Sequence, residues 1–311
     1  MRDSLSANIA AVAAFSLFGG AVVATRVVAQ DVPPLTLATL RIGLGAAVVW
    51  ALLPLLDRGG MRIRRSDIGL FVVLAAVYFA LFPAAMAAGL RLTEASRGAL
   101  MQATMPLWSV ALARMAGRER LSRRQVAGVL ISVSGIGLVF ADRAFPLDGS
   151  GSATLGNGLL LFSALCVAVY GVLSQRAFAR YSAPTVTAYT MLIGTVMLLP
   201  FAIAETVIVG PGDYTAQNVS LLVYLGSLGL AQLMFVFALT RLTPTQVTVA
   251  VNVSPLVATL LGAALLDEAL TGAFAAGFVA VLAGVVMVNW PARRSAGHVV
   301  PAETEGPGAG R

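Results

Sequence analysis

The chain has no lysine, one histidine and one cysteine among its 311 residues. Without lysine it cannot form a phosphate-binding G-x-x-x-x-G-K-[ST] loop, so ATP-driven pumping by this chain alone is not expected. His298 lies near the C-terminus, and no Cys/His cluster has the spacing of a zinc site. Cys166 stands alone inside an apolar run, which excludes a disulfide framework. We therefore expect no metal and no cofactor.

Charged residues are also scarce. They make up 11% of the chain, against about 25% in a soluble domain, while 58% of the residues are hydrophobic. One water-soluble core cannot bury so much apolar surface, which indicates that the chain lies in lipid. The formal charge of +7 comes from arginines in the short gaps between apolar runs. This placement is typical of membrane orientation, and no nucleic-acid partner is expected.

Acidic residues are missing from the middle of the apolar runs. All fourteen fall at run ends, in connections or in the C-terminal tail, and Glu205 is the deepest. No pair of carboxylates is placed for catalysis, so we predict no catalytic residue and no enzyme. Proton-coupled carriers commonly use a buried Asp or Glu. Without one, facilitated export and ion-coupled transport both remain open.

Ten apolar runs are long enough to cross a membrane as helices, which takes about 20 residues each. They cover residues 7–28, 34–56, 67–89, 94–115, 124–140, 155–178, 184–209, 217–240, 245–266 and 271–290. The sequence therefore predicts an all-α integral membrane protein with ten transmembrane helices.

The chain also repeats itself. Five pairs of identical residues lie 149 positions apart: Pro106 and Pro255, Glu119 and Glu268, Leu121 and Leu270, Gly128 and Gly277, Gly135 and Gly284. A fixed offset indicates a duplicated unit. We predict one five-helix repeat over residues 1–140, a linker over 141–154, a second repeat over 155–290 and a disordered cytoplasmic tail over 291–311. Because each repeat has an odd number of helices, the two should be inverted, as in secondary transporters.

The arginines predict the orientation of the chain. With the N-terminus inside, sixteen arginines lie on the inner side, four lie on the outer side and Arg41 lies within the membrane. The excess on one side follows the positive-inside rule. Both termini are therefore expected in the cytoplasm.

Two mid-run prolines are candidates for gating residues. Pro106 and Pro255 each remove a backbone donor and should kink a helix. The freed carbonyls lie about one turn from Gln102 and Asn252, where polar groups could line a cavity. The alternative is a pair of kinks that serve only packing.

Arg41 lies about 12 Å deep in the second run at 1.5 Å per residue. A cation there costs at least ~2.5 kcal/mol unless it is paired or hydrated. It could bind a substrate carboxylate, or it could snorkel or brace the fold. A cavity with few polar groups on an aromatic and Met-lined wall suits small amphipathic solutes. The candidate substrate-binding residues are Arg41, Tyr78, Met101, Gln102, Tyr170, Gln232, Phe235 and Asn252.

Two further patterns have structural and functional interpretations. Glu119 and Glu268 could couple transport to an ion, or they could cap the helices that follow them. Small residues are spaced along the fifth and tenth runs, where they should pack the scaffold or a partner closely: Gly128, Ser132, Ala276, Ala280 and Gly284.

Over residues 5–290 the chain resembles the drug/metabolite transporter superfamily, specifically EamA-type exporters. The resemblance rests on Leu40-Arg41-Ile42-Gly43, on Thr104-Met105-Pro106-Leu107, on Asn252-Val253-Ser254-Pro255-Leu256 and on the acid-Leu turns at Glu119 and Glu268. The family usually has Gly-Glu at these turns, where this chain has Arg118-Glu119 and Asp267-Glu268. The overall likeness is to the YddG-like aromatic amino-acid exporter branch.

The resemblance implies export of amino acids or similar small metabolites across a bacterial inner membrane, by alternating access. The expected partners are a small-molecule substrate and membrane lipid, and the sequence does not distinguish a monomer from a homodimer. The first alternative is efflux of cationic drugs, although no buried acid is available to meet a cation. From another class, the alternatives are a membrane scaffold and an integral-membrane enzyme.

Overall fold

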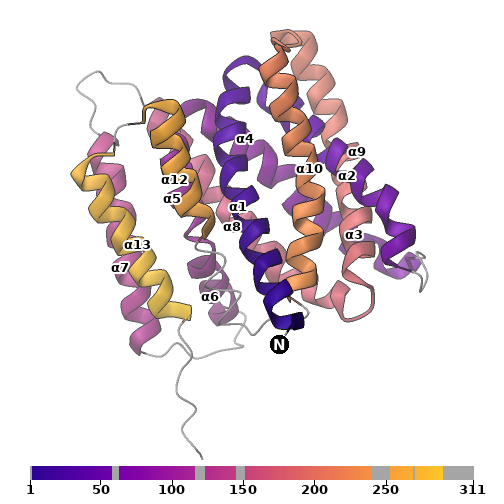
Figure 1. Cartoon of the computed structure of the whole chain (residues 1–311), viewed down its shortest axis with the longest axis horizontal. Helices are drawn as coiled ribbons and strands as arrows, with labels where there is room; N and C mark the ends of the chain where they lie inside the picture. The colour runs from indigo at the N-terminus through magenta and orange to yellow at the C-terminus, as the bar shows by residue number, and fades with distance from the viewer. Residues whose placement is uncertain are drawn as a thin grey trace, which may run out of the picture.

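The computed structural model describes residues 2–57, 63–115, 123–144, 151–239, 253–268 and 270–289, and within them it contains helices but no strand (Figure 1). The first part of the chain forms α1 (Arg2–Asp31), α2 (Pro34–Leu56), η1 (Arg65–Asp67), α3 (Ile68–Leu74), η2 (Ala75–Leu81), α4 (Phe82–Leu92), α5 (Ala95–Gln102), α6 (Met105–Met115) and α7 (Arg123–Ala144). The second part forms α8 (Ser152–Phe178), α9 (Ala183–Val209), α10 (Ala216–Leu239), α12 (Val253–Leu266) and α13 (Gly272–Asn289).

Several of these helices can cross a membrane. Within the described residues, six stretches are long and apolar enough: Ser6–Asp31, Pro34–Leu56, Arg65–Leu92, Ser152–Phe178, Ala183–Val209 and Ala216–Phe235. Two shorter apolar helices are Val253–Leu266 and Gly272–Met287. Large apolar side chains also face outward, and Val207 and Ile208 are 80% and 81% exposed. Lipid accepts such a surface whereas water does not, so the all-helical membrane fold predicted from composition is confirmed.

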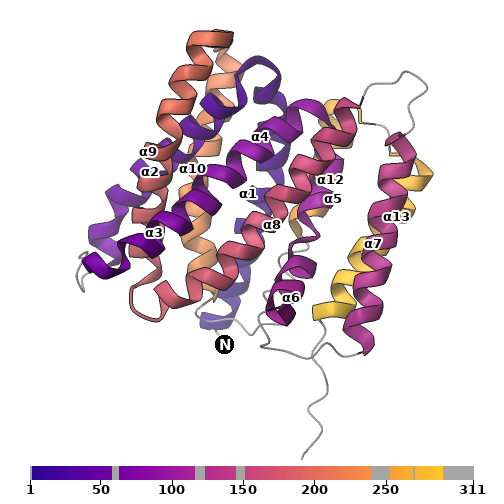
Figure 2. The same ribbon diagram turned by 180° about the vertical axis from the view of Figure 1, so that it is seen from behind.

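Helices from the two parts of the chain pack mainly on each other. α1 contacts α10 and, in a matching arrangement, α8 contacts α4. α2 pairs with α9, α5 with α12, and α7 with α13. Figure 2 shows the same pairs from behind, with α7 and α13 together at one edge. Most of the buried apolar surface therefore lies between the two parts, and neither part has a separate core.

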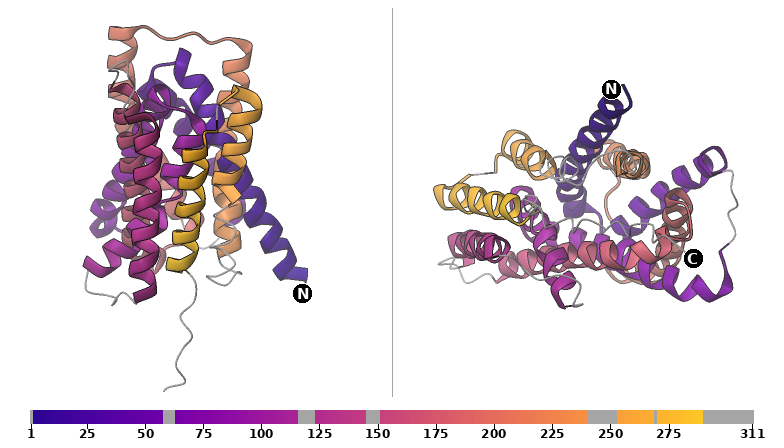
Figure 3. Two further views of the ribbon diagram at one scale, coloured as in Figure 1. Left: turned by 90° about the vertical axis from the view of Figure 1, so that its left-hand side faces the viewer. Right: turned by 90° about the horizontal axis from the view of Figure 1, so that it is seen from below.

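The chain passes repeatedly from one end of the molecule to the other. α1 begins at the end marked N in Figure 3, and α13 ends at that same end. At the opposite end, Arg26 near the end of α1 donates to Leu90 O of α4 over 2.9 Å, and Gly156 near the start of α8 packs against Leu92. α1 and α8 therefore start at opposite ends of the molecule. We call the end where α1 begins the N-terminal end, and the other the far end.

Acidic side chains hold α2 and α9 together at both ends. At the start of α2, Glu205 Oε2 accepts hydrogen bonds from the amides of Leu35 and Thr36, each over 2.9 Å. The Thr36 hydroxyl lies 3.1 Å from that of Thr206. At the start of α9, Asp57 accepts hydrogen bonds from two hydroxyl groups, those of Ser182 and Thr185. A carboxylate near a helix N-terminus satisfies free donors and suits the helix dipole.

α7 and α13 approach closely through the small residues predicted to pack the scaffold. The backbone of Gly284 lies against Gly128 and Ser132, and a Cβ at this position would overlap the Gly128 carbonyl oxygen. The Ser132 hydroxyl donates to Val281 O over 3.2 Å. The small-residue stripes therefore bring the two backbones together, as they do in other membrane helix pairs.

Some predicted features fall at or beyond the limits of the described residues. The predicted linker 141–154 overlaps the end of α7 at Ala144 and the start of α8 at Ser152. Residues 145–150 lie outside the described ranges, as do Glu119, the beginning of the predicted ninth helix and the tail 291–311.

Candidate functional site

Arg41 lies about a third of the way along α2, in an environment of aromatic rings and a thioether. Its Nη1 donates to the sulfur of Met86 over 3.6 Å, and its guanidinium carbon is 6.0 Å from the centroid of the Phe82 ring. Tyr78 and Tyr224 lie within electrostatic range of its charge. The side chain is partly buried and contacts α4 across the α2–α4 interface. These neighbours are neutral groups that solvate a cation only weakly.

No described carboxylate forms an ion pair with Arg41. The ion pairs in the described part of the chain lie near the helix ends, between Arg97 and Glu94 and between Arg180 and Asp67. A guanidinium presents five N–H donors in a planar fork that matches a carboxylate. Arg41 therefore carries a positive charge with no described carboxylate partner about a third of the way along a membrane helix, and an anionic group would offset its cost.

Three aromatic rings stack beside this cation. The Tyr78 ring is 5.3 Å from the Phe82 ring at an interplanar angle of 7°, and 4.3 Å from the Tyr170 ring at 19°. The rings come from η2, α4 and α8. Tyr78 and Phe82 are four residues apart, a spacing that brings helix side chains together. The stack thus links α8 to the segment that faces Arg41.

Tyr78 belongs to η2, a π-helical segment. Pro83 follows it in the first turn of α4, and proline has no N–H to donate to the carbonyl of Phe79 four residues earlier. This missing bond accounts for a wider turn at this point. On the neighbouring helix, Gly194 of α9 permits the approach, because a Cβ there would overlap Phe79. Local π turns are frequent at functional sites, and this one orients Tyr78.

The predicted kink in the fourth apolar run is present as a break. α5 ends at Gln102 and α6 begins at Met105, with Pro106 as its second residue. In the break, the Thr104 hydroxyl donates to Met101 O over 2.6 Å. Gln102 Nε2 donates to the Ser163 hydroxyl of α8 over 2.6 Å. The break therefore turns a polar amide toward α8, on the helix that also carries Tyr170.

The predicted binding residues occupy several places. Arg41, Tyr78 and Tyr170 come together around the stack, and Gln102 is joined to the same helix as Tyr170. Met101 is completely buried in an apolar cluster with Leu100 and Leu160. The remaining candidates are placed as follows: Gln232 is partly buried on α10, Phe235 packs edge-on against Phe15 at 5.2 Å, Pro255 is buried in the first turn of α12, and Asn252 lies outside the described residues.

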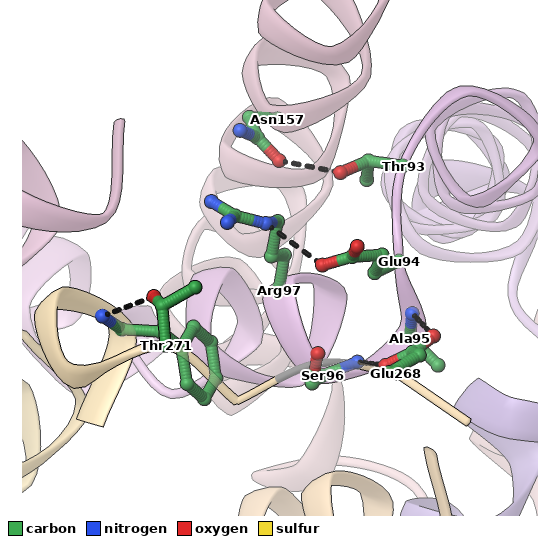
Figure 4. Close-up of polar contacts among 9 residues, drawn as sticks. Thr93, Glu94, Ala95, Ser96, Arg97, Asn157, Glu268 and Thr271 are labelled. Atoms are coloured by element: carbon green, nitrogen blue, oxygen red, sulfur yellow. Dashed lines mark hydrogen bonds and ion pairs between the residues drawn. The ribbon is translucent and has the colours of Figure 1, made fainter. Parts of the chain in front are cut away.

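A second group of polar residues lies at the far end. Glu268, which follows α12, accepts hydrogen bonds from the amides of Ala95 and Ser96 at the start of α5 over 2.5 and 2.8 Å (Figure 4). A Cβ at Gly262 of α12 would lie 2.6 Å from Glu268 Oε2, so the glycine makes room for this carboxylate. Glu268 therefore caps a helix from the first part of the chain.

The sequence predicted that Glu268 would cap the helix that follows it, and that expectation is wrong in its target. The following helix, α13, is capped by Thr271, whose Oγ1 accepts from the amide of Phe274 over 3.1 Å. Short-range spacing favours the next helix in the chain, whereas the tertiary fold brings α5 closer to the carboxylate.

A cavity of about 580 Å³ opens beside Glu268. Its lining is mostly charged or polar and consists of Arg26, Val27, Gln30, Asp31, Glu94, Leu266, Asp267 and Glu268. Several of these acids already have partners. Glu94 pairs with Arg97 at 3.0 Å, and Asp31 accepts from Asn218 over 2.8 Å. This cavity forms a polar mouth at the far end of the molecule.

Sequence reasoning missed several residues of both groups. Phe82 and Met86 contact Arg41 but have no polar atom that would mark them in an apolar run. The spacing of four residues between Tyr78 and Phe82 is the signal that could have identified Phe82. Thr93 and Asn157 form a buried hydrogen bond of 3.1 Å between α4 and α8 that no local pattern indicates (Figure 4).

Comparison with known proteins identifies the fold and its relatives. A solved structure, described only as the crystal structure of a protein, aligns with a TM-score of 0.62 over 92% of this chain and 98% of that chain, at 22% identity. The "Uncharacterized transporter YoaV" of Bacillus subtilis is 22% identical over 87% of this chain and 92% of its own length. The "Probable terminal-alkyne amino-acid exporter" of Streptantibioticus cattleyicolor is 26% identical over 80% of this chain and 81% of its own.

A further relative is the "Probable amino-acid metabolite efflux pump" of Salmonella typhimurium, 27% identical over 61% of this chain and 66% of its own length. These names describe transporters and not enzymes. The EamA-like transporter family matches residues 5–141 and again residues 154–290, so two copies of its repeat cover most of the chain. The chain therefore belongs to the EamA-like transporter family.

Proposed function

We propose that this transporter exports amino acids or closely related small metabolites across the bacterial inner membrane. The observation that carries the proposal is Arg41, a cation within a membrane helix with no carboxylate partner among the described residues, beside the Phe82–Tyr78–Tyr170 stack. The names of two relatives, an amino-acid exporter and an amino-acid metabolite efflux pump, support the same class of cargo.

The chemistry of the cluster suits a zwitterion with an apolar or aromatic side chain. The guanidinium of Arg41 can receive a carboxylate through two parallel N–H bonds. The faces of aromatic rings attract an ammonium group and also pack against apolar side chains. Gln102, at the break between α5 and α6, adds an amide that can donate or accept.

The mechanism proposed is alternating access by two inverted five-helix repeats, residues 1–140 and 155–290. Support comes from the opposite starting ends of α1 and α8 and from the matched pairs α1–α10 and α8–α4. We further propose that both termini are cytoplasmic. In favour of this orientation, the described arginines concentrate at the N-terminal end, among them Arg64, Arg65, Arg123, Arg124, Arg176 and Arg180.

Proteoliposome transport tests the cargo directly. We expect uptake of labelled amino acids and little uptake of the matching amines, which lack the carboxylate. Arg41→Gln removes the charge and should raise KM roughly tenfold or more, since a charge-assisted hydrogen bond contributes about 1.5–3 kcal/mol. Arg41→Lys keeps the charge but lacks the planar guanidinium, so its KM should lie between those of the wild type and Arg41→Gln. Arg123→Gln removes an exposed arginine from the start of α7 and serves as the matched control.

The same experiment separates the alternatives. Efflux of cations is favoured by one observation, the acids that line the mouth at the far end. A cation carrier would move the amines and would not be weakened by Arg41→Gln. Wild-type KM for amino acids in Arg41→Gln would assign Arg41 to bracing the fold. Flux without an ion gradient would indicate a facilitator, and flux only with a gradient would indicate ion coupling.

A further inference from the structure

A small basic cavity lies at the N-terminal end, away from Arg41 and from the mouth. Arg64, Arg180 and Tyr181 line a cavity of about 310 Å³. Arg64 comes shortly before α3 and the other two shortly after α8, and Figure 2 shows both helices. α3 and α8 are in contact, so the cavity lies between two membrane helices. A volume of this size holds a small polar group but not a whole lipid or peptide.

A hydrogen-bonded network fixes the floor of this cavity. The Asp67 side chain, 8% exposed, accepts from Arg180 Nη1 over 2.8 Å at one oxygen and from the Tyr181 hydroxyl over 2.7 Å at the other. The Tyr181 hydroxyl in turn accepts from the Arg64 amide over 3.1 Å. Both oxygens of Asp67 are therefore occupied, and Arg180 and Tyr181 are held in place. A second carboxylate, Asp57, lies nearby and accepts from the hydroxyl of Ser182, the residue after Tyr181.

Positive charge remains after this pairing. Arg180 balances Asp67, yet its side chain is 61% exposed and retains N–H donors. Arg64 and Arg65 are exposed, and within the described ranges neither forms an ion pair. The cavity thus presents several donors and surplus positive charge, which suits an anion with several oxygens, such as a phosphate group.

Apolar side chains continue from the same helix ends. Ile68 and Val72 of α3 are 49% and 39% exposed, and Phe178 of α8 is 39% exposed. Ile68 and Val72 follow Arg64 and Arg65 by a few residues, and Phe178 precedes Arg180 by two, on helices that can cross the membrane. A ligand bound here would place a polar headgroup in the basic cavity and an apolar part against the adjacent side chains. A phospholipid at the membrane surface has this arrangement.

We propose that this cavity binds the phosphate headgroup of an anionic membrane lipid, whose acyl chains lie along Ile68, Val72 and Phe178. Free inorganic phosphate shares the headgroup chemistry but gains nothing from the apolar surface. The lipid should therefore bind much more tightly than phosphate. Binding should also weaken as salt rises, because the contacts are largely electrostatic.

The test is lipid binding to the purified full-length protein in a neutral detergent, followed by native mass spectrometry. Phosphatidylglycerol supplies the anionic headgroup, phosphatidylcholine the matched zwitterionic one, and inorganic phosphate the free anion. The variant is Arg64→Gln with Arg65→Gln, since the side chains of these arginines make no contact in the Asp67 network, which uses only the backbone amide of Arg64. The control is Arg123→Gln with Arg124→Gln, which removes two charges from the start of α7 at the same end.

We expect wild-type protein to retain phosphatidylglycerol in preference to phosphatidylcholine and to lose it as salt rises. The variant should bind it more than tenfold more weakly, at about fivefold per arginine, and the control should bind it normally. Equal retention of both lipids, or normal binding by the variant, would overturn the proposal. Displacement of the lipid by phosphate at a similar concentration would reassign the cavity to the free anion. None of these outcomes depends on the transported cargo.

Discussion

Two interfaces between the repeats differ in how they are held. At the α2–α9 interface, acids anchor both helix starts, Glu205 at α2 and Asp57 at α9. At the α5–α12 interface, Glu268 anchors the start of α5, a helix of eight residues that ends in a break. From this difference we infer that α2–α9 acts as a fixed axis in the proposed transport cycle, whereas α5–α12 opens at the far end, where Glu268 lies.

The largest effect is expected from Gly262→Val. The new side chain would occupy the space of the Glu268 carboxylate, which lies 2.6 Å from the position of a Cβ, so the anchor on α5 would be lost and the helices forced apart. Transport should fall to background while some protein still reaches the membrane. Gly272→Val, at a position with no atom within 4 Å of a Cβ, is the control. Equal flux in both variants, measured per protein molecule, would contradict the account.

Glu205→Ala should act on stability more than on transport. It leaves two amides at the start of α2 without their acceptor, at a cost of about 2–3 kcal/mol in the free energy of unfolding. Thermal unfolding and membrane abundance measure this loss. Flux per folded molecule should stay near wild type if α2–α9 remains closed during transport, as we infer. Normal stability with lost flux would reverse the roles of the two interfaces.

Glu268→Gln is expected to have a smaller effect. The amide keeps one oxygen that can accept from Ala95 or Ser96 but loses the charge that suits a helix N-terminus, about 1 kcal/mol. Flux should drop a few-fold under every condition. Selective loss of pH-driven flux, with exchange of cargo unaffected, would instead assign Glu268 to ion coupling.

Thr271→Ala should have the smallest effect. It removes the cap of α13, at a cost of about 1 kcal/mol. Thermal unfolding should shift slightly and transport should not change. A large loss of transport in this variant would show that any disturbance near Glu268 inactivates the protein. The Gly262 and Glu268 variants would then say nothing specific about the α5–α12 interface.

The length of the apolar runs and the residue offsets predicted the helical membrane fold. In lipid every backbone polar group must be hydrogen-bonded within the protein, which restricts membrane-spanning structures to helices and closed barrels. Pro106 predicted the break between α5 and α6 for a local reason, its missing donor. The partner of Glu268 was not predictable in this way. It lies on α5, and nothing in the local sequence connects a turn after α12 with the start of that helix. The Phe82–Tyr78–Tyr170 stack likewise depends on a contact between distant segments.

Pulsed electron paramagnetic resonance on Cys166→Ala protein tests the difference between the interfaces most directly. Spin labels at Arg91→Cys, near the end of α4 just before α5, and at Leu270→Cys, just after α12, report on the far end of the α5–α12 interface. Labels at Leu55→Cys and Val196→Cys, both at exposed positions, span α2–α9. On addition of an amino acid that the liposome assay shows to be carried, the first distance should change and the second should not. Equal changes, or no change in either pair, would contradict the account.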